Sequence, residues 1–230
     1  MIDETFPHAW HAEILAARPL ILPPRHFTYP RDAEEVERGA LEVMVRPERQ
    51  GLKPGSFLGA GCGTTEAGPF YKAPNAGFVE SRGPKGEEPA APSRSPSAQD
   101  FLATCALGFR DPAVPTGLWS CPNPGELCAV SGGYAYLIDT ADPKRFAMLP
   151  YRPVLEVRPA PAHGLLLFVS HHRILAWGSN GQAWESPKLS DEGVTLAAID
   201  GDTLHGLGWN MMTDKETPFA LDLITGALLP

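Results

Sequence analysis

Two pairs of histidines in this chain have side chains and a spacing that could bind a metal ion. His171 and His172 are adjacent and lie between two apolar segments, LLLFVS and RILAWG. Adjacent side chains of an extended chain point to opposite faces, so the two rings can rarely bind one metal ion. We therefore predict a solvated hairpin tip at this position rather than a metal site.

His8 and His11 are the weak candidates for a metal site. Their spacing of three would place them on one face of a helix, an acceptable arrangement for a ligand pair. No third histidine lies near them in the sequence. We therefore predict neither a metal nor any other cofactor.

Four cysteines complete the set of possible metal ligands and nucleophiles: Cys62, Cys105, Cys121 and Cys128. Six residues separate the last two, which is too wide for a zinc knuckle, and no second close pair follows. Two disulfides are possible. Because no export signal is evident, we expect the cysteines to be reduced and buried instead.

Motifs for nucleophilic catalysis and phosphate binding are incomplete. The chain contains no Gly-x-Ser-x-Gly sequence, which leaves an α/β-hydrolase unsupported. The glycine-rich stretch 59–63 lacks the Gly-Lys-Ser/Thr ending of a phosphate loop. No catalytic residue is predicted from the sequence.

One interstrand segment, residues 206–217, has an unusual composition for a loop: an aromatic side chain, two methionines, an amide and charges of both signs. Loops on a rigid sheet often carry binding function. The candidate partner-binding residues are Trp209, Asn210, Met211, Met212, Asp214 and Lys215. The alternative is a packed connection whose methionines fill gaps in the core. Trp119, Trp177 and Trp184 also fall near strand ends, where core packing or ligand stacking would account for them.

Short apolar strands separated by turn residues must position these candidates. Residues 101–230 contain eleven such strands, and most are apolar on both faces. We predict an antiparallel meander of at least eight strands without a helix longer than two turns. Asn180-Gly181 is the best hairpin signal, since a type I′ turn requires two positive φ values. Alignment of Asp139 with Gly178 and Asp222 gives spacings of 39 and 44 residues, in the range of one propeller blade.

In its period and in its pattern of a strand, an Asp or Gly and a turn Gly, the segment 101–230 resembles WD40-like and quinoprotein-like β-propellers. The Gly-His and Trp-Asp dipeptides of the WD40 class and the tryptophan-docking pattern of quinoproteins are missing. The resemblance implies an all-β fold, an antiparallel β-propeller-like meander of four-stranded units of about 40–45 residues. The number of blades stays open.

The remaining sequence divides into two regions. Residues 1–46 are expected to form a small irregular segment that packs on or completes the β domain. It combines an amphipathic stretch, a strand at Pro19–Pro23, one short helix after Asp32 and a strand at Ala40–Val45. Residues 47–100 are rich in Gly, Pro and Ser, and Ser81–Asp100 lacks any large apolar residue, which predicts a disordered loop that proteases cut first. A weak echo of residues 101–123 within 57–75 leaves a further repeat open.

Composition and charge limit the possible functions. The chain has 23 glycines and 25 prolines among 230 residues, which favours turns over long helices. A net charge of −8 disfavours nucleic acid as a partner, and no run of residues is long and apolar enough for a membrane span. A cytoplasmic location is the expectation. Two function classes remain: a non-catalytic scaffold or protein-binding module, and a hydrolase or lyase whose site assembles at the mouth of a propeller channel.

Overall fold

The computed structural model describes residues 1–31, 39–48 and 99–230. The predictions of a helix after Asp32, a disordered Ser81–Asp100 and a further repeat within 47–80 fall mainly on residues 32–38 and 49–98, which lie outside these ranges, as does Cys62. In the described ranges no helix has the length and apolar character to cross a membrane. Their only helix is one 3-10 turn, Pro161–His163.

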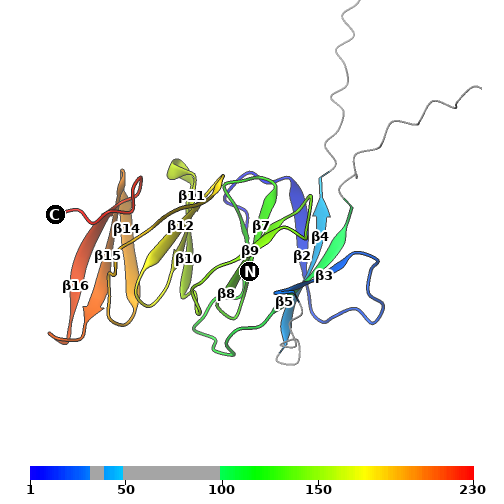
Figure 1. The fold of residues 1–230 in the computed structure, drawn as a ribbon, viewed down its shortest axis with the longest axis horizontal. Coiled ribbons are helices and arrows are strands. Elements are labelled where there is room, and N and C mark those ends of the chain that lie inside the picture. The colour runs from blue at the N-terminus through cyan, green and yellow to red at the C-terminus, as the bar shows by residue number, and fades with distance from the viewer. Residues whose placement is uncertain (32–38, 49–98) are drawn as a thin grey trace, which may run out of the picture. The chain divides into compact units, whose positions relative to one another are not determined.

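The described residues form an all-β fold of four open sheets, numbered here in stacking order (Figure 1). Sheet 1 contains, in spatial order, β2 (Trp10–Leu15), β4 (Ala40–Pro47), β5 (Phe101–Ala106) and β3 (His26–Tyr29). Sheet 2 contains β1 (Ile2–Asp3), β6 (Gly117–Ser120), β7 (Glu126–Ser131), β8 (Tyr134–Asp139) and β9 (Phe146–Met148). Sheet 3 contains β10 (Glu156–Ala160), β11 (Leu165–Val169), β12 (Ile174–Gly178) and β13 (Gly181–Glu185). Sheet 4 contains β14 (Val194–Asp200), β15 (Thr203–Asn210) and β16 (Lys215–Asp222).

The antiparallel arrangement predicted for 101–230 is confirmed from β6 onward, but it is divided among three sheets, and β5 lies in sheet 1, where it pairs with β3 in parallel. From β6 onward each sheet adds its strands in chain order with antiparallel pairing, and all eleven predicted strands are present. The sequence reading missed β6, which has only four residues. Asp139, Gly178 and Asp222 are the last residues of β8, β12 and β16. None of the described sheets closes on itself. Sheets 3 and 4 are antiparallel throughout, whereas sheets 1 and 2 each contain one parallel pair, β3 with β5 and β1 with β6.

The N-terminal region differs from its prediction. The amphipathic stretch around His8 and His11 forms strand β2 rather than a helix, and Pro19–Pro23 is a loop rather than a strand. Alternation along β2 explains the first difference: Trp10 is buried, His11 is exposed and Glu13 is exposed. The region is also less irregular than expected, since β2, β3 and β4 complete sheet 1 around β5.

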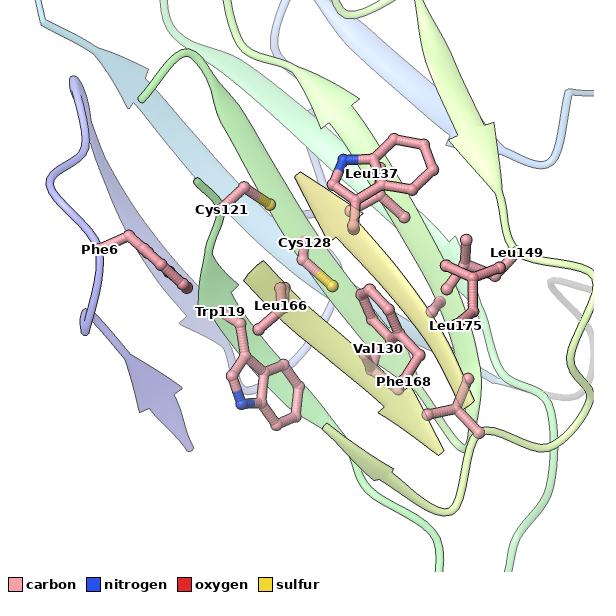
Figure 2. Packing of buried hydrophobic residues seen from close by; sticks show 13 residues of the cluster. Phe6, Trp119, Cys121, Cys128, Val130, Leu137, Leu149, Leu166, Phe168 and Leu175 are labelled. Carbon is pink, nitrogen blue, oxygen red and sulfur yellow. The ribbon is translucent and has the colours of Figure 1, made fainter. Parts of the chain in front are cut away.

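Three hydrophobic clusters lie between the sheets and determine their order. The first joins sheets 1 and 2 through Val43, Phe101 and Leu127. The second joins sheets 2 and 3 through Trp119, Val130 and Phe168, as Figure 2 shows. The third joins sheets 3 and 4. Sheets 2 and 3 thus pack on both faces, which explains why their inner strands, such as β11, are apolar throughout.

Sheet 4 has an apolar strand that is not buried on both faces. Its strand β14 has the apolar sequence VTLAAI, yet only Val194 and Leu196 are buried. Ile199 is 36% exposed on this strand. Two-sided burial is therefore a wrong expectation for β14, because within the described chain sheet 4 packs through one cluster only.

The Asn180-Gly181 hairpin is present with a different turn. Gly178 pairs with Gly181, so the two loop residues are Ser179 and Asn180. Among these residues only Gly181 has a positive φ, of 105°. A type I′ turn is therefore excluded, since it needs positive φ at both loop positions.

Candidate functional site

The predicted partner-binding residues lie at one hairpin tip between β15 and β16 (Figure 1). Trp209 and Asn210 end β15, Lys215 begins β16, and Met211 to Asp214 form the turn. We call residues 209–215 the hairpin tip. A tight turn at the end of two paired eight-residue strands holds these side chains at a defined place.

Side-chain acceptors organise the backbone of the hairpin tip. The Asn210 Oδ1 atom accepts hydrogen bonds from the amides of Met212 and Thr213, at 3.0 and 3.1 Å. The Asp191 Oδ2 atom accepts one from the Met211 amide at 2.9 Å. Asp214 has φ of 54°, the left-handed conformation that Asp tolerates better than most residues. The tip is therefore preorganised before any partner arrives.

Two methionine side chains project from this organised backbone into solvent. Met211 is 70% exposed and Met212 is 88% exposed. By contrast, Met44 and Met148 pack partly buried in the sheets. The two tip methionines therefore do not fill gaps in the core, which was the alternative explanation for this segment.

Trp209 and Asn210 belong to a shallow cleft beside the tip, of about 210 Å³, whose other wall is the segment 188–191. Its centre is the buried Ser190, whose hydroxyl accepts from the Trp209 amide at 2.8 Å and donates to the Gly193 carbonyl at 2.6 Å. Met211, Met212, Asp214 and Lys215 do not line this cleft. Of the six predicted residues, two therefore line the cleft, and the other four lie in the turn or at the start of β16.

Lys188 and Asp191 add charge next to the tip. Their Nζ and Oδ1 atoms are 2.6 Å apart. The hydrogen bond from Lys188, followed by that from the Met211 amide, lowers the pKa of Asp191 below its ordinary value. An ionised Asp191 therefore holds the Met211 amide throughout the neutral pH range.

The histidines predicted from the sequence do not gather around a common point in the described chain. His8 contacts the Trp10 ring, at 4.5 Å between centroids, and His11 lies 3.7 Å from Glu48. No group of three or more His, Cys, Asp or Glu residues in the described chain could hold a metal ion. His171 and His172 occupy the predicted tip between β11 and β12.

Three cysteines, Cys105, Cys121 and Cys128, are free and fully buried, as expected for structural thiols. Burial raises the pKa of each thiol, so none of the three supplies a thiolate nucleophile at neutral pH.

Tryptophans connect neighbouring sheets rather than form a stacking platform. The Trp10 ring N–H donates to the Glu126 carbonyl between sheets 1 and 2, at 3.0 Å. The Trp177 ring N–H donates to Glu126 Oε2 between sheets 2 and 3, at 3.0 Å. The Trp184 ring N–H donates to the Leu223 carbonyl between sheet 3 and the end of sheet 4, at 2.7 Å. Each junction therefore contains one such bond, and the core-packing expectation holds for Trp177 and Trp184.

Glu126 is a titratable group that sequence reasoning missed. It lines a cavity of about 200 Å³ with Asp139, Arg145 and Trp177. Burial is the main cause that raises the pKa of Glu126, and Asp139 adds to it while the Trp177 hydrogen bond opposes it. Glu126 and Asp139 are cross-strand partners in β7 and β8, 13 positions apart in the chain. Only the pairing of these strands could have revealed the pair.

A second missed group crosses sheet 1. The Thr104 hydroxyl donates to Glu42 Oε2 at 2.6 Å and lies 2.8 Å from His26 Nε2. Because the single hydroxyl proton goes to Glu42, the histidine must donate through Nε2. Burial, together with Arg18, lowers the pKa of His26. The buried Thr104 hydroxyl thus lies between the Glu42 carboxylate and the His26 ring and is hydrogen-bonded to both. It is therefore not free to act as a nucleophile.

Comparison with known proteins adds no assignment, since no protein-family model and no curated protein matches the chain.

Proposed function

We propose that this protein is a non-catalytic binding module whose hairpin tip contacts a protein partner. The observation that carries the proposal is the pair Met211 and Met212, exposed at 70% and 88% on a turn whose backbone is already hydrogen-bonded. Methionine is common at binding surfaces because its flexible thioether adapts to many shapes. A preorganised turn loses little conformational entropy on binding, so more of the contact energy appears as affinity.

The stacked sheets provide the scaffold for this tip. Sheets 2, 3 and 4 each contain three consecutive antiparallel strands, and Asp139, Gly178 and Asp222 end the third strand of each. The spacings of 39 and 44 residues between them support the interpretation of these sheets as blade-like repeats of a propeller-like stack. A rigid β scaffold that presents a loop at its edge is a common architecture for binding proteins.

The proposal is tested by quantitative affinity capture from native cells with three proteins. These are the wild type, Met211→Glu/Met212→Glu, and the control Ile224→Glu. Ile224 is 67% exposed in the turn after β16, so the control adds one of the same charges to a similarly exposed apolar site. We expect at least one partner to bind the wild type and the control, and to lose about 30-fold or more in affinity for the double variant. Identical capture by all three proteins would show that the tip is not the contact.

The enzyme alternative rests on one observation, the pairing of Glu126 with Asp139 in the same cavity. A carboxyl with a raised pKa can act as a general acid beside a second carboxylate, as in many hydrolases and lyases. Asp139 Oδ2 lies 3.5 Å from Arg145 Nη1. A panel of chromogenic glycosides and esters tests this alternative. Turnover by the wild type that disappears in Glu126→Gln would replace the binding module with an enzyme.

A further inference from the structure

A second cleft, of about 360 Å³, lies where the connection between β9 and β10 meets the tip between β11 and β12. Residues 150–153 form one wall, and residues 170–173 with Glu185 of β13 form the other. Its volume falls in the range of small-molecule sites, and it is larger than the cleft beside the hairpin tip. This cleft is separate from the residues of the proposed function.

Two arginines give this cleft a positive character on a chain whose net charge is −8. Arg152 lies over the Tyr134 ring at 5.4 Å, and among the described residues no carboxylate is within ion-pair distance of it. Arg173 donates to the Ser186 carbonyl at 3.2 Å and lies 3.6 Å from Glu185. The cleft lining thus contains two arginines and one acidic residue, so its formal charge is positive.

The Tyr151 hydroxyl is a second polar feature of the cleft. Its oxygen is buried and makes no hydrogen bond of good geometry among the described residues, although the Glu185 carboxylate lies close enough to interact with it as an acceptor. Buried polar groups are nearly always well paired, so this hydroxyl can still take a better placed acceptor. Burial, with the nearby Glu185 carboxylate, raises the pKa of Tyr151. The hydroxyl therefore keeps its proton and can donate it to an acceptor that enters the cleft.

His172 supplies a further polar atom. Its Nδ1 atom is 3.2 Å from the Ser190 carbonyl oxygen, and a carbonyl can only accept, so Nδ1 carries a proton. The Nε2 atom is then left for another partner. His171, with its ring 6.2 Å from that of His172, lines the same cleft.

We propose that this cleft binds a small molecule through an oxyanion, a carboxylate or a phosphate group. Arginine guanidinium groups recognise both through paired N–H donors. Arg152 and Arg173 supply the charge, and the Tyr151 hydroxyl supplies a neutral donor. Glu185 keeps Arg173 in place and repels a ligand that carries its charge on that side of the cleft.

The test is a titration of ¹⁵N-labelled protein with inorganic phosphate and with succinate at constant ionic strength, followed by amide NMR. We expect saturable shifts confined to the amides of Tyr151, Arg152, Glu185 and residues 170–173 with at least one of the two probes. Arg152→Gln should weaken this binding by tenfold or more. Arg158→Gln is the matched control, because Arg158 lies nearby on β10, pairs with Glu156 and does not line the cleft. It should change affinity less than twofold.

Tyr151→Phe separates ligand binding from stability, because the variant removes only the hydroxyl. We expect severalfold weaker binding of the probe with an unchanged or higher melting temperature, since a poorly paired buried hydroxyl does not stabilise the fold. Non-saturable shifts with both probes, or equal affinities for Arg152→Gln and Arg158→Gln, would overturn the proposal. Equal probe affinity of Tyr151→Phe and the wild type would also overturn it.

Discussion

At the level of single residues, Glu126 connects three sheets. Its carbonyl accepts from Trp10 of sheet 1 and its carboxylate accepts from Trp177 of sheet 3, while its own strand belongs to sheet 2. The carboxylate is therefore held at a half-buried place where ionisation is unfavourable. Such a group makes stability depend on pH.

Glu126→Gln should remove that dependence. Because the folded pKa lies above the ordinary value of 4.5, the folded state binds its proton more tightly, and stability falls as pH rises above that value. Glutamine keeps an acceptor for Trp177 without the charge. Thermal melting from pH 4 to pH 8 should show no gain for the variant at pH 4 and a higher melting temperature than the wild type at pH 7. A difference that does not vary with pH would contradict the role of Glu126 burial.

Gly226 tests the junction of sheets 3 and 4. It has φ of 73°, and an added Cβ would lie 2.6 Å from the Trp184 ring. Gly226→Ala should therefore cost about 2–4 kcal/mol from backbone strain and overpacking together. Gly201 is the control, with φ of 55° and no atom within 4 Å of an added Cβ, so Gly201→Ala should cost about 1–2 kcal/mol. Urea unfolding measures both, and equal losses would show that Trp184 moves aside freely.

At the level of elements, strand β11 shows how one strand serves two junctions. Leu166 packs in the cluster between sheets 2 and 3, and Leu167 packs in the cluster between sheets 3 and 4. Both side chains are fully buried. Adjacent residues of a strand point to opposite faces, so the same Leu→Ala substitution at each position perturbs one junction at a time.

Alanine at each leucine should loosen a different part of the protein. Either substitution should cost about 2–5 kcal/mol through the cavity that it leaves. In hydrogen exchange, Leu167→Ala should raise the exchange of β14–β16 most, and Leu166→Ala should raise that of β6–β9 most. The same exchange pattern in both variants would mean that the sheets do not form the stack described here.

The sequence predicts a strand where an apolar run is long enough to stand out between turn residues. The strands from β7 to β16 were predictable because runs such as LLLFV are bounded by turn residues. Strand β6 is not predicted, because its four residues, GLWS, include only two large apolar side chains and do not form an apolar run. In β2, buried Trp10 and exposed His11 and Glu13 follow the period of two that is typical of a strand. The spacing of His8 and His11 fits a helix instead, and it is misleading here.

The candidate sites divide in the same way. The hairpin tip was predictable because its composition is local to residues 206–217. The Glu126 pair and the Tyr151 cleft each join residues from separate strands or connections, so they exist only after the strands pair and the sheets stack. No spacing in the chain encodes them.

At the level of the whole molecule, a stack of β-sheets carries an exposed apolar turn at the hairpin tip, and Leu20–Leu22 form another exposed apolar segment. Large apolar side chains on a soluble surface indicate interaction sites when they gather at one place. Met211 and Met212 contribute little to folding because they contact mainly solvent. Met211→Ala/Met212→Ala should therefore change the free energy of unfolding by less than about 0.5 kcal/mol. Thermal melting checks this, and a large loss would mean that the two side chains are packed.

The most direct test of the account maps where a partner touches the protein. All five methionines, Met1, Met44, Met148, Met211 and Met212, can be replaced by a photoreactive methionine analogue and irradiated in native cells. The account predicts that cross-linked peptides of a partner protein are joined at Met211 or Met212. Partner cross-links found only at Met1, Met44 or Met148, with none at the hairpin tip, would contradict it.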